Sequence, residues 1–316
     1  MHGPPVRALV VVLVIQVVLG AGIVVAAVNG FPLIGGGGDP ARDEQRSAGA
    51  PLAPRPAVDR FDEARAFALL RLQVDDIGPR VAGSPQARRL ASAARRRLPR
   101  GRFEPLPGHP DLRNVVGTLP GRRPAIVVGA HYDTVDTPRG MPGANDGASG
   151  TAVVLELARA LRRLPRPAGA REVRFVLFDG EEAPGDRDFA DTGLRGSRAY
   201  VKAHRRAIGR MVLLDYVGDR ELSLPREATS DTALWARLRA AARRVGVQRV
   251  FADSTGAAVL DDHTPFLKAG IPAIDLIDWP YRYFHTLQDT VDKTSPRSLD
   301  AVGEAVLELL LELRRS

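Results

Sequence analysis

Short apolar runs without a regular polar alternation recur along the C-terminal part of the chain. The four clearest are AIVVGAH (125–131), VRFVLFD (173–179), MVLLDYV (211–217) and PAIDLID (272–278). Runs of this kind are typical of strands whose two faces are both covered, as in a sheet with helices on each side. The pattern therefore predicts strands of a buried α/β sheet at these four positions.

Two longer segments show apolar residues at helical spacing, ASGTAVVLELARALRRL (148–164) and AVGEAVLELLLELRR (301–315). An apolar stripe at this period predicts helices packed on the core. We find no internal repeat and no second linker after residue 58. We therefore expect one α/β domain over 58–316, with a mostly parallel central mixed sheet and helices on both faces.

The N-terminal segment has a different character. Residues 8–28 contain one polar residue, Gln16, and no charge, which is the length and composition of a transmembrane helix. We interpret this segment as an uncleaved signal anchor that follows a short tail (1–7) and precedes a flexible Gly-, Pro- and Ala-rich tether (29–57). A weak excess of positive charge before the span predicts a single-pass membrane protein with its catalytic domain on the extracytoplasmic side.

The composition restricts the kinds of metal site and of binding partner that this chain can have. The chain has no cysteine, so disulfides and thiolate metal sites are excluded, and a metal ion must be held by histidines and carboxylates. The net charge of +8 comes mostly from arginines on expected helix faces, without interleaved aromatic residues. We therefore expect no nucleic-acid partner, and an anionic lipid surface or solvated helix faces explain the charge. The oligomeric state is left open.

Polar residues cluster where the predicted strands end, which is the edge of an α/β sheet at which ligand sites collect. Together with an acid in the loop before the first helix and a histidine after the last strand, they form a mixed nitrogen and oxygen ligand set suited to zinc or a similar divalent ion. The candidate ligands are His131, Asp146, Glu182, Asp215 and His285, and Asp133 and Glu181 lie in the same strand-end cluster.

Successive motifs resemble those of metallopeptidase family twenty-eight, which comprises co-catalytic zinc aminopeptidases and their relatives. The resemblance runs in order from about residue 70 to the C-terminus, and the combination of motifs is far more specific than any one of them. The motifs are IGPRVAGSPQARRLA (77–91), GAHYDTV (129–135), PGANDGASGTAVVLELAR (142–159), FDGEE (178–182), GLRGSRAYV (193–201), LLDYVG (213–218), DDHTPFLKAGIPA (261–273) and HTLQDT (285–290).

The resemblance implies a zinc-exopeptidase-like fold and two zinc ions per chain. Asp146 would bridge the ions, with His131 and Asp215 at one site and Glu182 and His285 at the other.

The resemblance also implies roles for two further acids. Asp133 would orient the first histidine, and Glu181 would act as the general base that passes a proton from the attacking water to the leaving amine. The expected activity is a membrane-anchored metallopeptidase of the aminopeptidase type, a hydrolase acting on peptides with a free N-terminus.

Two other functions are kept open. Glutaminyl-peptide cyclases resemble the same family but bind one zinc and form N-terminal pyroglutamate. Three features favour this alternative: the DGEEAP segment, the insert before Gly196 and the paired acids of DDHTPF. Phe284 stands where those cyclases typically have tryptophan, and Asp275 where the animal enzymes have a pocket histidine. A tethered binding domain without catalysis is the third hypothesis, which the presence of the full ligand set and Glu181 disfavours.

Overall fold

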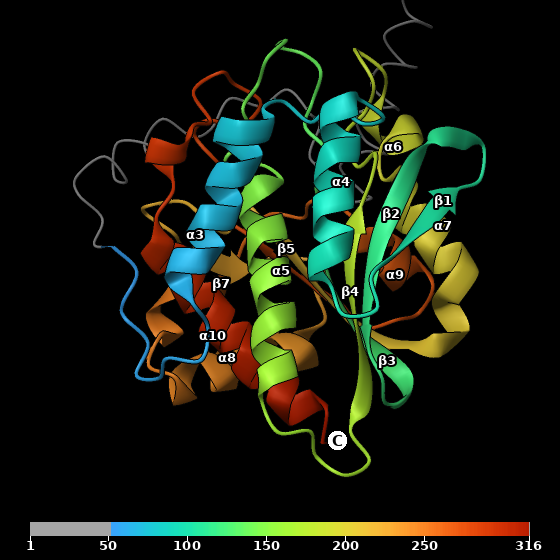
Figure 1. Cartoon of the computed structure of the whole chain (residues 1–316). Coiled ribbons are helices and arrows are strands. Elements are labelled where there is room, and N and C mark those ends of the chain that lie inside the picture. Colours follow the sequence, from blue (N-terminus) through green and yellow to red (C-terminus); the bar gives the residue numbers. More distant parts are fainter. Residues whose placement is uncertain (1–51, 316) are drawn as a thin grey trace, which may run out of the picture.

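The computed structural model describes residues 52–315 (Figure 1). The predicted membrane segment (8–28) and most of the predicted tether (29–57) lie outside these residues. Within the described range, no helix combines the length and the apolar character that crossing a bilayer requires. The last residues of the tether, 52–57, pack on the domain: Ala53 is buried, and the Ala57 N–H donates to the Val245 carbonyl at 2.8 Å.

A six-stranded sheet forms the centre of the described chain, with strand order β1-β2-β4-β3-β5-β8. Its strands are β1 (Arg102–Leu106), β2 (His109–Leu119), β3 (Arg122–His131), β4 (Arg171–Phe178), β5 (Ile208–Asp215) and β8 (Ala273–Ile277). β3, β4, β5 and β8 run parallel, whereas β1 and β2 are antiparallel additions at one edge. The four strands that the apolar runs predict are therefore confirmed, and so is the mostly parallel mixed sheet.

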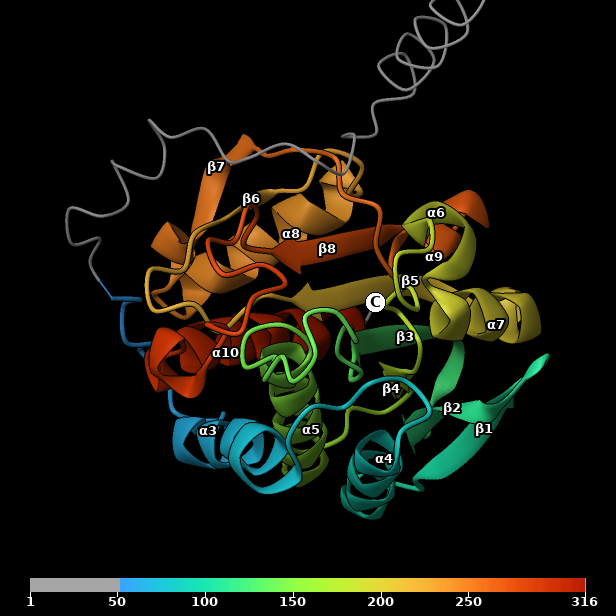
Figure 2. The same ribbon diagram turned by 90° about the horizontal axis from the view of Figure 1, so that it is seen from above.

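Helices cover both faces of this sheet (Figure 2). One face packs against α3 (Glu63–Arg71), α4 (Pro85–Arg97), α5 (Ala148–Arg163), α8 (Thr232–Arg244) and α10 (Pro296–Leu313). The other packs against α7 (Arg195–His204) and α9 (Thr264–Lys268). Along β3, Ile126 and Val128 belong to the first cluster and Val127 to the second, so successive side chains bury on opposite faces. Double burial is the physical reason for the uninterrupted apolar runs.

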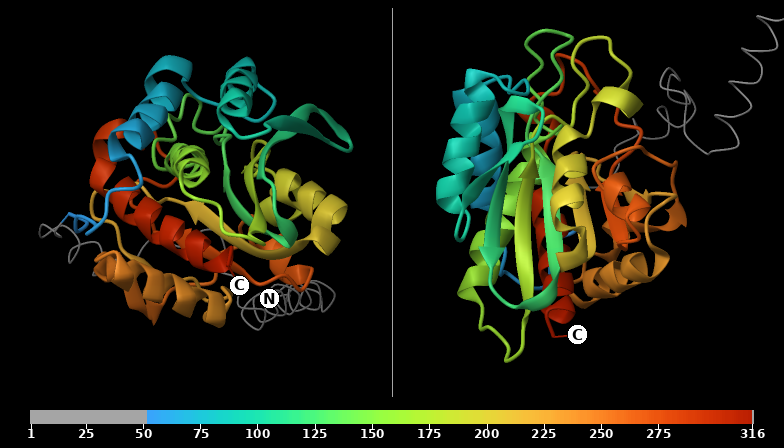
Figure 3. Two further views of the ribbon diagram at one scale, coloured as in Figure 1. Left: turned by 60° about the horizontal axis from the view of Figure 1, so that its bottom comes forward. Right: turned by 90° about the vertical axis from the view of Figure 1, so that its right-hand side faces the viewer.

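The shorter elements connect this frame. They are the π-helical turn η1 (Leu72–Ile77), the one-turn helix α6 (Phe189–Thr192), the 3₁₀ turns η2 (Arg205–Ala207), η3 (Gln248–Val250) and η4 (Val291–Lys293), and the small parallel pair β6 (Leu224–Arg226) and β7 (Phe251–Thr255). The loops that follow β3, β4 and β8 gather at one end of the molecule (Figure 3, right panel). This end is the carboxyl edge of the parallel strands.

Candidate metal centre

The carboxyl edge of the sheet brings the predicted residues together. His131 and Asp215 are the last residues of the adjacent parallel strands β3 and β5. Glu181 and Glu182 follow β4, which pairs with the other side of β3. Asp146 lies in the loop before α5, and His285 lies in the loop after β8. The buried members of the group are His131, Asp133, Asp146, Glu182 and Asp215. Parallel strands end at the same edge, so their terminal side chains face a common space.

Asp146 lies between the two histidine rings. Its Oδ1 is 3.2 Å from Nε2 of His131, and its Oδ2 is 3.7 Å from Nε2 of His285. Each ring also faces one more carboxylate, because His131 Nε2 is 3.3 Å from Asp215 Oδ1 and His285 Nε2 is 3.4 Å from Glu182 Oε2. The site therefore consists of two imidazole–carboxylate pairs joined by one shared carboxylate.

Burial and crowding of charge shift the proton affinities of these groups. Burial raises the pKa of Asp215 to about 7, against the opposing effect of the His131 ring. Burial lowers the pKa of His285, but the carboxylates of Glu182 and Asp146 outweigh it and bring the pKa to about 8. Burial and the adjacent charge of Glu182 raise the pKa of Glu181 well above its usual range. Excess buried negative charge of this kind suits a cation.

Glu181 and Asp133 lie on the far side of the His131 ring from Asp146. Glu181 Oε2 is 3.9 Å from His131 Nδ1, and Asp133 Oδ1 is 3.8 Å from the same nitrogen. Both separations exceed a hydrogen bond, and Nδ1 has no hydrogen-bond partner among the described residues. The Asp133 carboxylate instead accepts the backbone N–H groups of Glu181 and Glu182, each at 3.2 Å. Asp133 thus holds the chain segment that carries the two glutamates.

Three further residues support Asp146 and were not singled out by sequence reasoning. The Tyr216 hydroxyl donates to Asp146 Oδ2 at 2.8 Å. Asp289 accepts the backbone N–H groups of Asn145 and Asp146 at 2.9 and 3.0 Å, and also the Tyr281 hydroxyl. Tyr216 and Asp289 each stand in a family-like motif, LLDYVG and HTLQDT, so position in a motif was the available signal.

The third supporting residue is Arg80, a fully buried arginine. Its guanidinium donates to the carbonyls of Pro142 and Gly143 at 2.9 and 2.7 Å, and so fixes the loop that carries Asp146. Burial lowers the pKa of Arg80 to about 10, although nearby carboxylates oppose that shift. The guanidinium remains charged at neutral pH.

Backbone strain is concentrated in this site. Tyr216 and His285 are two of the four non-glycine residues with positive φ in the described chain, at 46° and 50°. Such conformations cost free energy and persist where the surrounding structure imposes them. Here they turn the side chains of both residues toward Asp146.

Aromatic residues form one wall beside the centre. Tyr216 packs against Tyr281 with ring centroids 5.2 Å apart, and Phe284 stacks on the ring of His285 at 3.7 Å. Trp279 meets Phe284 edge to face at 4.8 Å. The 279–284 segment thus contributes an aromatic wall that restrains the His285 ring.

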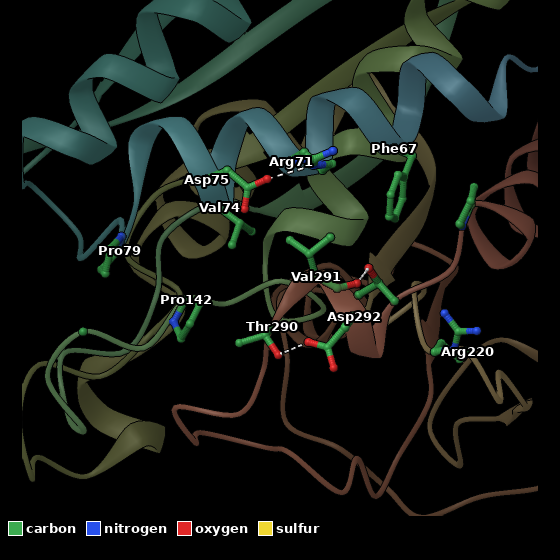
Figure 4. A pocket seen from close by; sticks show the side chains of 13 residues that line it. Phe67, Arg71, Val74, Asp75, Pro79, Pro142, Arg220, Thr290, Val291 and Asp292 are labelled. Atoms are coloured by element: carbon green, nitrogen blue, oxygen red, sulfur yellow. Dashed lines mark hydrogen bonds and ion pairs between the residues drawn. The ribbon is translucent and has the colours of Figure 1, made fainter.

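A surface pocket of about 800 Å³ opens on another side of the Asp146 loop, between the α3–η1 segment and η4 (Figure 4). Phe67, Arg71 and Arg220 contribute to its lining, and the Arg71 guanidinium donates to Asp75 at 2.8 Å. None of the residues predicted for the metal centre lines this pocket. The buried cluster, and not this pocket, is the candidate site.

Comparison with known proteins gives one family. The sequence profile described as "Peptidase family M28" matches residues 114–310. Aminopeptidase YwaD of Bacillus subtilis is 31% identical over 207 residues, which cover 60% of this chain and 42% of that protein. The glutaminyl-peptide cyclotransferase of Bothrops jararaca is 28% identical over 245 residues, covering 65% of this chain and 66% of that protein. The chain thus spans less than two thirds of the length of these two relatives.

A solved structure extends the match. The glutaminyl cyclase of an Acidobacteriales bacterium has a TM-score of 0.72 and 30% sequence identity, and the alignment covers 84% of this chain and 98% of that one. The described architecture is therefore shared with an enzyme of this group over nearly its whole length.

Proposed function

The chain belongs to peptidase family M28, as its motifs predicted, and we propose that within this family it is a zinc-dependent aminopeptidase that removes N-terminal residues from peptides. One observation carries the proposal. The two oxygens of Asp146 face two imidazoles, His131 and His285, each of which has a second carboxylate beside it. A shared carboxylate with a ligand pair on either side is the arrangement that holds two metal ions.

The donor set fits zinc. It offers two imidazole nitrogens and three carboxylates, without thiolates, and all of these side chains except the 30% exposed His285 are buried. His131 and Asp215 would hold one ion, Glu182 and His285 the other, and Asp146 both. The chemistry that zinc supplies is polarisation of a peptide carbonyl and acidification of a water molecule.

The chain's own residues would position the substrate and move the proton. Glu181 is 8% exposed and has a raised pKa, so it can take a proton from the attacking water and return it to the leaving amine. The Asp133 carboxylate holds Glu181 in place by accepting the backbone N–H of Glu181. The aromatic wall at Tyr216, Tyr281 and Phe284 provides an apolar surface beside the reacting groups.

A second candidate function, glutaminyl-peptide cyclisation, has specific support. By sequence, the match covers 66% of the glutaminyl-peptide cyclotransferase of Bothrops jararaca but 42% of aminopeptidase YwaD. Asp261 and Asp262, both buried, also lie near enough to Glu181 to raise its pKa. A cyclase would use Glu181 to move the proton from the N-terminal amine without cleaving a peptide bond.

One experiment separates these functions. The purified full chain, loaded with zinc, is incubated with leucine amide and with a peptide that begins with glutamine, and the products are weighed by mass spectrometry. Release of leucine supports the aminopeptidase. Loss of one ammonia from the glutamine peptide, without release of leucine, supports the cyclase. Absence of both products supports the tethered binding domain.

The cellular placement is also a proposal. We propose that residues 8–28 anchor the protein in a membrane with the catalytic domain on the extracytoplasmic side. Membrane fractionation with protease accessibility on intact cells tests it, and a soluble full-length protein would contradict it.

A further inference from the structure

We propose a second buried cation site in this protein, formed by His263, Asp261 and Asp275, which takes a divalent transition-metal ion such as Zn²⁺. The three side chains each place one ligand atom so that all three atoms lie within 4.8 Å of one another. One imidazole nitrogen and two carboxylate oxygens form a donor set of the same chemical kind as the first centre.

The second cluster shares no residue with the first. Asp275 lies in the middle of β8, where it pairs with Leu213 of β5, two positions before the level of Asp215. Asp261 and His263 lie immediately before α9. A metal ion here would therefore join the start of α9 to the interior of the sheet.

The hydrogen bonds of Glu227 determine which nitrogen of His263 is free. Glu227 accepts the backbone N–H groups of Thr229 and Val259 at 2.9 and 3.1 Å and the Ser230 hydroxyl at 3.0 Å, so it is held as a carboxylate.

His263 Nε2 lies 3.3 Å from Glu227 Oε2 and 3.0 Å from Thr229 Oγ1. Because the Thr229 hydroxyl already donates to Glu227 at 2.9 Å, the proton between the ring and Glu227 belongs on Nε2. In the neutral ring Nδ1 then carries the lone pair, and it faces Asp275 Oδ2 at 3.6 Å. A carboxylate that fixes one nitrogen while the other faces ligands is the arrangement found behind metal-binding histidines.

Several buried polar atoms of these three side chains lack a hydrogen bond within the described part of the chain. Nδ1 of His263, both oxygens of Asp275 and Oδ2 of Asp261 form no hydrogen bond among the described residues. The three side chains are at most 3% exposed, so water does not reach them freely. Buried polar atoms without partners are costly, and a cation bound to them removes that cost.

The buried charges around His263 also favour a bound cation. Four carboxylates are buried here, those of Asp261, Asp262, Asp275 and Glu227. Within the described residues, Glu227 and Asp275 both form their ion pair with the same ring, that of His263. A divalent cation offsets this excess negative charge.

The test uses the full chain with the first centre disabled. The variant Asp146→Asn/Glu182→Gln removes two ligands of the first centre while keeping side-chain size. After loading with Zn²⁺ and gel filtration, we expect this variant to retain about one zinc per chain by elemental analysis, and we expect the further change His263→Gln to remove it. His204→Gln is the matched control, since His204 pairs with Glu104 at 2.9 Å elsewhere in the fold and should leave the retained zinc unchanged.

A folded Asp146→Asn/Glu182→Gln variant that retains no zinc would overturn the proposal, and so would zinc that survives His263→Gln. Circular dichroism establishes that each variant is folded. The single variant His263→Gln leaves only the first centre intact, so a failure of that variant to bind zinc bears on the proposed function and not on this site.

A second measurement needs no variant. Crystals of the unmodified protein soaked in Zn²⁺ should give an anomalous peak about 2.0–2.1 Å from Nδ1 of His263, the distance of a zinc–imidazole bond. A map without a peak at His263 overturns the proposal, whether or not the Asp146 centre is filled.

Discussion

The phenol of Tyr216 donates a 2.8 Å hydrogen bond to Oδ2 of Asp146, the carboxylate oxygen that faces the ring of His285. Burial opposes ionisation of Asp146, but the His131 and His285 rings and, to a smaller extent, this bond lower its pKa. Tyr216 also holds its own backbone at a positive φ of 46° to reach this position. The relationship makes Tyr216 a positioning residue of the proposed metal centre.

Replacing Tyr216 with phenylalanine should weaken metal binding. Without the phenol, protons compete better for Asp146, and its orientation is less restricted, so we expect roughly a tenfold loss of zinc affinity. A chelator-competition titration measures it. Tyr283→Phe is the matched control, since its ring packs on Tyr281 in the same aromatic group and lies beside Lys293. Equal affinities in both variants would remove Tyr216 from this role.

Asp289→Asn should also weaken the centre. The Asp289 carboxylate receives the N–H groups of Asn145 and Asp146, and an amide nitrogen in its place would repel one of these donors. Changes behind metal ligands typically cost about 10- to 100-fold in affinity or activity. Zinc titration and turnover measure the effect, and exposed Asp292, which pairs with Lys293, provides the control Asp292→Asn. An unchanged affinity in Asp289→Asn would contradict the prediction.

Glu181→Gln should separate binding from turnover. The amide keeps the size of the side chain but cannot accept a proton, so we expect unchanged zinc content and a loss of activity of roughly 100- to 10,000-fold. Glu221→Gln changes a glutamate outside the cluster and should leave both quantities unchanged. Turnover that survives in Glu181→Gln would rule out the general-base role.

Asp300→Asn should stabilise the protein in a pH-dependent manner. Burial and the charges of Glu63, Glu304 and Asp59 raise the pKa of Asp300 from 3.8 to about 7. An acid with a higher pKa in the folded chain lowers the free energy of unfolding as pH rises through that interval. The asparagine variant avoids this loss.

The melting temperature of the Asp300→Asn variant should therefore exceed that of the unmodified protein by more at pH 8 than at pH 5. Asp111→Asn changes an exposed carboxylate on β2 and is the control. A gain that is the same at both pH values, or larger at pH 5, would contradict the assignment.

Gly303→Ala should destabilise the fold although alanine favours helices. A Cβ at residue 303 of α10 would lie 2.5 Å from atoms of the buried Phe61 ring. Overpacking of a filled core costs about 1–3 kcal/mol, which exceeds the helix-propensity gain of about 1 kcal/mol. Denaturant unfolding measures the change. Adding Phe61→Leu should recover part of it, and strictly additive effects of the two substitutions would show that they do not touch.

The edge of the sheet shows why some of the fold was not predicted. β1 and β2 form a hairpin around the 107–108 turn, and their outer residues are partly exposed. Edge strands of this kind lack the continuous apolar run that identified β3, β4, β5 and β8, although Pro107 and Gly108 were a usable turn signal. The helices that the 148–164 and 301–315 patterns predicted are present, the second beginning earlier, at Pro296.

The sequence by itself determined the α/β class, the four parallel strands and the family, because double burial and motif order are both written along the chain. It also supplied the seven residues of the candidate centre, whose catalytic and metal-binding roles stay predictions. Only the tertiary structure showed which residues hold these seven side chains in place. The bonds of Tyr216 and Asp289 to the Asp146 segment join residues 70 and 143 positions apart, and the free nitrogen of His263 depends on Glu227. Such contacts arise from how strands and loops pack in space, which no local pattern of side chains encodes.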